Sequence, residues 1–129
     1  MAGHGADSGT DTRGAAVAAD PGDTEYLQVQ TTTDSRAEAM ELAHDAVAAR
    51  LAACAQVAGP IASTYWWEGE IERAEEWLIM LKLPADRYDA LAEFLTERHS
   101  YDEPEITATD IVAGSAGHLT WIAEETRPE

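Results

Sequence analysis

Basic residues and cysteine are scarce in this chain. Its 129 residues carry 8 Lys and Arg against 25 Asp and Glu, which gives a formal net charge of -17. A surface this negative repels phosphate backbones and anionic lipid headgroups, so we expect no nucleic acid and no membrane among its partners. The only cysteine, Cys54, excludes an intramolecular disulfide framework and a Cys-rich metal cluster. We therefore expect a reducing, cytoplasmic setting.

Long apolar runs are absent as well. A helix that spans a bilayer needs roughly 20 mostly apolar residues, and no stretch of the sequence reaches that length. The short apolar stretch 15–19 follows acidic residues, so we expect no export signal and a soluble chain. Residues 1–24 hold too few large apolar side chains to form a core, which predicts a disordered acidic tail before one folded domain at 25–129.

Hydrophobic patterning predicts four strands and three helices in that domain. The expected strands are 25–33, 53–67, 70–83 and 105–113, and the expected helices are 35–51, 85–98 and a short one after 115. Ser35 is the predicted N-cap of the first helix, with Met40 and Ala43 on its apolar side. Gly59-Pro60 predicts a bulge and Glu68-Gly69 a hairpin turn. This order is typical of an α+β, ferredoxin-like β-α-β-β-α-β sandwich with a short C-terminal helix.

The segment Trp77–Leu83 loses the alternation of apolar and polar residues. A strand that is apolar on both faces must be covered on both faces. Two helices can cover only one face of the predicted sheet. The sequence therefore predicts that another subunit covers the second face.

Five segments together resemble the CutA family of divalent-cation tolerance proteins. They are Arg50-Leu51-Ala52-Ala53-Cys54, Tyr65-Trp66-Trp67-Glu68-Gly69-Glu70-Ile71, Lys82, His99-Ser100-Tyr101-Asp102-Glu103-Pro104-Glu105-Ile106 and Leu119-Thr120-Trp121-Ile122. The resemblance covers roughly residues 25–127. It implies a homotrimer whose long hairpins pack against neighbouring subunits, with an architecture similar to that of the PII signalling proteins. It also implies a role in the response to divalent metal ions, with copper or another cation as the bound ion.

The segment 99–105 is the candidate metal site, with His99 and Glu105 as the predicted ligands, because divalent cations take imidazole and carboxylate donors. The structural alternative is that His99 caps a helix and the acids are solvated. The resemblance implies a copper site whose three positions hold Gln30, Arg98 and Glu105 here. Only the carboxylate is retained, since a guanidinium has no lone pair to donate.

Tyr101, Arg98 and Trp67 are the candidate contacts for a small ligand in clefts between subunits. Arg98 favours an anionic ligand, whereas Glu105 favours a cation. Two functions therefore stay open: a CutA-like trimer that responds to divalent cations, and a PII-like sensor that binds a metabolite or nucleotide and signals to a partner. His99 has no nucleophile or oxyanion signature beside it, so we predict that the protein is not an enzyme. We interpret Cys54 as a buried, inert thiol.

Overall fold

A computed structural model describes residues 26–128, and the predicted tail at 1–24 lies outside the described residues. The chain forms a mixed α+β fold with the predicted order of elements. The elements are β1 (Tyr26–Thr33), α1 (Arg36–Ala48), β2 (Cys54–Trp67), β3 (Glu70–Pro84), the 3-10 turn η2 (Ala85–Arg87), α2 (Tyr88–Arg98), β4 (Thr107–Asp110) and α3 (Ala116–Glu125). None of the helices within 26–128 is long and apolar enough to cross a bilayer.

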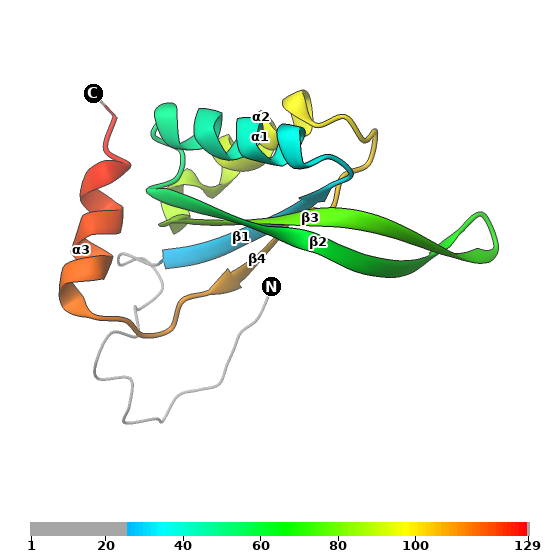
Figure 1. The fold of residues 1–129 in the computed structure, drawn as a ribbon. Coiled ribbons are helices and arrows are strands. Elements are labelled where there is room, and N and C mark those ends of the chain that lie inside the picture. Colours follow the sequence, from blue (N-terminus) through cyan, green and yellow to red (C-terminus); the bar gives the residue numbers. More distant parts are fainter. Residues whose placement is uncertain (1–25, 129) are drawn as a thin grey trace.

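The four strands form one antiparallel sheet in the order β2-β3-β1-β4. Helices α1 and α2 lie over the same face of this sheet, and the β2–β3 hairpin extends well beyond them (Figure 1). Helix α3 lies at the end of the sheet away from the hairpin tip (Figure 1). The sheet therefore has one face that helices cover and one face that α1 and α2 leave open.

The hairpin has the bulge and the turn that the sequence predicts. The register of β2 against β3 shifts between Ala58 and Ile61, so Gly59 and Pro60 form a bulge. Gly69 takes φ +84 in the turn after Glu68, a backbone conformation that glycine adopts without strain. The bulge divides the hairpin into a base within the sheet and an outer arm, residues 61–76.

The main core lies between α1, α2 and the covered face of the sheet. Ile79, Leu81 and Leu83 of β3 are fully buried there, together with Val29 of β1. The residues between them on β3, Leu78, Met80 and Lys82, alternate to the open face and are half-buried. Leu78 and Met80 pack against neither apolar cluster within residues 26–128. These two side chains are therefore the apolar part of the second face that the sequence predicts.

Three local expectations from the sequence are wrong. Met40 is 45% exposed, whereas Ala43, which is also predicted on the apolar side, is buried together with Ala39, Leu42 and Ala46. The last strand covers only Thr107–Asp110, because few of its residues find pairing partners on β1. Cys54 is half-buried, not fully buried, because it faces the open side of the sheet opposite Lys82.

Candidate functional site

The outer arm of the hairpin is a two-stranded ribbon with aromatic side chains on both faces. Cross-strand partners point to the same face, so Tyr65 and Trp67 share one face with Glu70 and Glu72. Trp66 lies opposite Ile71 on the other face. The exposed fractions are 72% for Trp66, 59% for Trp67 and 61% for Ile71. An isolated two-stranded ribbon is only marginally stable in water. Contact with other protein surfaces on both faces would therefore stabilise the arm.

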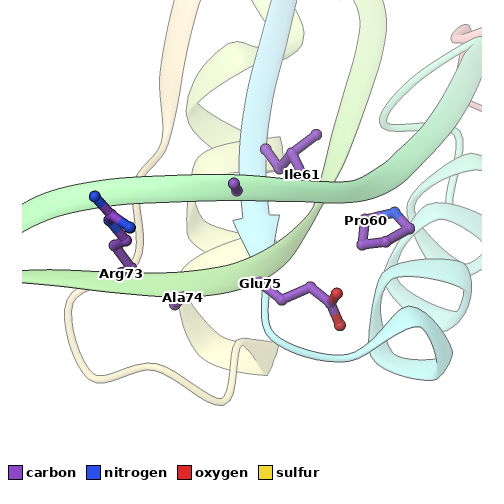
Figure 2. A pocket seen from close by; sticks show the side chains of 6 residues that line it. Pro60, Ile61, Arg73, Ala74 and Glu75 are labelled. Atoms are coloured by element: carbon purple, nitrogen blue, oxygen red, sulfur yellow. The ribbon is translucent and has the colours of Figure 1, made fainter.

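A hollow of about 390 Å³ lies on the arm beside the bulge, and its lining residues are Pro60, Ile61, Ala62, Arg73, Ala74 and Glu75. Figure 2 shows that Arg73 and Glu75 lie apart along β3, with Pro60 across on β2. Every lining residue comes from the ribbon itself, so no second element walls the hollow. It is a shallow depression in an exposed surface, and it lacks the convergent polar groups of a ligand pocket.

His99, the predicted metal ligand, is held by hydrogen bonds at both ring nitrogens. Its side chain is 0% exposed. Nε2 donates to the Thr32 carbonyl at 2.8 Å, and Nδ1 accepts from the Tyr101 backbone N–H at 3.0 Å. Since a carbonyl only accepts and a backbone N–H only donates, the ring is the neutral Nε2–H tautomer. Neither nitrogen offers a lone pair to a metal ion in this arrangement.

Glu38 ties the loop that follows α2 to the start of α1. Its Oε2 accepts from the Ser100 backbone N–H at 2.9 Å, and its Oε1 accepts from the Ser100 hydroxyl at 2.8 Å. Ser35 caps α1 by accepting from the Glu38 backbone N–H at 3.1 Å, as the sequence predicts. The Glu38 carboxylate bonds to the distant loop, although the capping-box pattern predicts that it turns back to Ser35. Sequence spacing alone gives no signal of this second role.

Tyr101 joins the same loop to the base of the outer arm. Its hydroxyl donates to Glu76 Oε2 of β3 at 2.8 Å. Burial raises the pKa of the Tyr101 phenol above its ordinary value, and the hydrogen bond to Glu76 raises it further, because both favour the neutral form. The rings of His99 and Tyr101 lie 4.9 Å apart. The structure thus brings together these two predicted residues as a structural tie.

The other predicted site residues lie elsewhere. Arg98 Nη1 donates to Asp45 Oδ2 at 3.0 Å, and its guanidinium stacks over the Phe94 ring at 4.5 Å. Glu105 is exposed, and its Oε2 accepts from Gln30 Nε2 at 3.0 Å. Trp67 is at the hairpin tip. Within one chain, therefore, Arg98, Tyr101 and Trp67 form no common ligand site.

The residues present do not fit a copper centre within one chain. Glu105 is the only carboxylate at the three family positions, and it bonds the amide of Gln30, while Arg98 is paired with Asp45. Among residues 26–128, no group of three or more His, Cys, Asp or Glu side chains is placed to hold a metal ion. The chemistry of the donor set therefore supplies a single carboxylate, where copper prefers several imidazole or thiolate ligands.

Comparison with known proteins gives one family. The sequence model of the CutA1 divalent ion tolerance proteins matches residues 27–125. The divalent-cation tolerance protein CutA of Citrobacter koseri is 33% identical over 103 residues, which is 80% of this chain and 90% of that protein. The structure of CutA from Synechococcus elongatus superposes with a TM-score of 0.77 at 33% identity and covers 80% of this chain and 91% of that one.

Plant and archaeal relatives overturn the expected cytoplasmic location. The chloroplastic CutA 1 of Oryza sativa is 34% identical over 101 residues, and the chain spans 57% of its length. The solved CutA of Archaeoglobus fulgidus is named a periplasmic protein, and it matches with a TM-score of 0.77, 32% identity and 79% and 99% of the two chains covered. The argument from a single cysteine was therefore wrong as a guide to compartment, because a chain with one thiol needs no disulfide anywhere.

Proposed function

The chain belongs to the CutA1 divalent ion tolerance family, and on that premise we propose that it acts in tolerance to divalent cations as a homotrimer of ferredoxin-like protomers. Residues 25–129 form the domain that does so. The proposed assembly is supported by the exposed arm, whose two faces both present large aromatic or aliphatic side chains. A ribbon of this kind becomes stable when other chains cover it.

A closed ring of three suits the arm better than a two-fold dimer does. In a two-fold dimer, one surface of each chain meets the same surface of its partner. The arm has two different apolar faces, so it fits between two neighbours in a heterologous, cyclic arrangement. The tie from Tyr101 to Glu76 supports this role, because it fixes the arm at its base.

The cation response in this proposal rests on surface carboxylates. With 25 acidic and 8 basic residues, each protomer has a formal net charge of -17 and attracts cations. Glu105 stays the proposed metal contact of the pair predicted from sequence, since its carboxylate is exposed on the open side. His99 has the structural role described above. The PII-like sensor is not favoured, because Arg98 is engaged with Asp45 and Phe94 and the relatives are named as divalent-cation tolerance proteins. These names describe tolerance proteins and not enzymes.

Complementation tests this function. The chain is expressed in an Escherichia coli strain that lacks its own CutA, a relative 33% identical over 104 residues. We expect growth in copper, zinc and cadmium to return to the level of the parent strain. As a control, an arm variant with Trp66→Ser and Trp67→Ser, which leaves the protomer core intact, should fail to restore growth. Equal growth with the empty vector and the intact chain would contradict the proposal.

A further inference from the structure

Helix α3 packs against a small cluster of apolar side chains that is separate from the main core. Leu119 and Ile122 are buried in this cluster with Ala53, and Tyr26 and Ile111 pack against them. The larger cluster, which joins α1, α2 and the sheet, includes no residue of α3. Because an element that buries little apolar surface opens at a low cost in free energy, we expect α3 to be the helix that is held least firmly.

The segment that connects β4 to α3 is open to solvent. The Ile111 backbone N–H donates to the Tyr26 carbonyl at 2.9 Å and fixes the start of this segment. Every residue from 112 to 118 is exposed. Ser115 is at the N-cap of α3, but its side chain makes no capping hydrogen bond. The N-terminal end of α3 is therefore held weakly.

Arg50 holds the opposite end of α3. Its Nη1 donates to Glu125 Oε1 at 2.8 Å and to the Glu125 carbonyl at 3.0 Å. Arg87 Nη2 of the turn η2 donates in turn to the Arg50 carbonyl at 3.3 Å. Because Arg50 follows α1 and η2 precedes α2, these bonds tie the last turn of α3 to the ends of both other helices.

The backbone of Arg50 has a conformation that usually selects glycine. The Arg50 N–H donates to the Val47 carbonyl and the Leu51 N–H donates to the Ala46 carbonyl, both at 3.0 Å, which is the Schellman motif that ends α1. Arg50 takes φ +63 in this motif, where a residue with a side chain is strained and glycine is not. Glycine would therefore suit the end of α1 better, and the contact with Glu125 is what the arginine side chain adds.

We infer that α3 is a latch on the end of the sheet, which Arg50 holds closed and which opens as one unit about the segment 112–115. Opening leaves α1, α2 and the sheet folded, and it uncovers Tyr26, Ala53 and Ile111. The side chains of Arg50 and Glu125 are 40% and 44% exposed, so dissolved salt screens their attraction and loosens the latch. All of these contacts lie within one chain, so the latch does not depend on the proposed assembly.

Hydrogen exchange on the intact protein, followed by mass spectrometry of peptides at one protein concentration, tests the latch. In the parent protein, the amides of α3 should exchange at least about tenfold faster than those of the buried residues 79–83 in β3, which open only when the whole domain unfolds. Arg50→Gly should speed exchange in α3 about five- to thirtyfold, because both bonds to Glu125 are lost. The same substitution should leave exchange in β3 unchanged or slower, because it relieves the strained backbone.

Asp45→Asn is the matched control, because it breaks the exposed ion pair of Arg98, which joins α1 to α2, and should leave exchange in α3 unchanged. Raising the salt concentration from about 0.05 M to about 1 M should speed exchange in α3 of the parent protein but not of Arg50→Gly. Equal exchange rates of α3 and β3 in the parent protein would overturn the inference. It would also be overturned if Arg50→Gly accelerated both regions by the same factor, since Arg50 would then stabilise the whole domain and not the latch.

Discussion

Replacing His99 with Ala separates a structural histidine from a metal ligand. The substitution removes both ring hydrogen bonds and leaves the Thr32 carbonyl and the Tyr101 N–H without these partners. Each buried group left unpaired costs about 1–3 kcal/mol, and the lost ring adds a cavity. We therefore expect the free energy of unfolding to fall by about 3–5 kcal/mol. Guanidinium unfolding at one fixed protein concentration measures it, because the stability of an oligomer depends on concentration.

The matched control is Glu105→Gln, which keeps an acceptor for the Gln30 amide at an exposed position. Its stability should lie within about 0.5 kcal/mol of the parent protein. Calorimetry with copper near physiological ionic strength, at a temperature where circular dichroism shows each protein folded, completes the comparison. We expect His99→Ala to bind as much copper as the parent. A loss of stability below about 1 kcal/mol together with loss of a saturable copper site would refute the structural role of His99.

Three further substitutions have defined outcomes. Tyr101→Phe removes the donor to Glu76 and should cost about 1–2 kcal/mol in chemical unfolding at pH 7. Since the folded protein holds the pKa of this phenol above its unfolded value, the parent should lose stability as the pH rises above about 10, and the variant should lose less; equal pH profiles would contradict this. Gly59→Ala places a Cβ 2.6 Å from Trp77 Cδ1 and should lower stability by about 2–3 kcal/mol in thermal melts, so an unchanged melting temperature would refute the close approach. Arg98→Ala breaks an exposed ion pair, so we expect a change of about 0.5 kcal/mol and the same calorimetric heat with ATP as for the parent; a nucleotide signal lost in the variant would revive the sensor hypothesis.

Local sequence signals predicted most of the fold. The Ser35 cap, the Gly59-Pro60 bulge and the Gly69 turn are where their chemistry requires, because each depends on neighbours a few residues away. Met40 was misplaced because several stripes of alanine and larger residues satisfy helical spacing in α1. Which stripe is buried depends on the sheet beneath it, and spacing alone cannot decide that.

The candidate site was harder to predict because its contacts are distant in sequence. His99 reaches Thr32, Ser100 reaches Glu38, and Tyr101 reaches Glu76. A histidine next to acids has the same local pattern whether it binds a metal or a carbonyl. Only the position of β1 beside the loop distinguishes these roles, since the pairing of β4 with β1 stops at Gln30 and leaves the Thr32 carbonyl to the imidazole.

The mass of the protein in solution tests the account most directly, because the proposed assembly covers the exposed arm and the open face with other copies of the chain. Light scattering on the peak from size-exclusion chromatography should give three times the 13.9 kDa chain mass for the parent protein over the working concentration range. The variant with Trp66→Ser and Trp67→Ser should shift toward the mass of one chain while circular dichroism keeps the protomer signal. A parent protein that stays at 13.9 kDa would contradict the account.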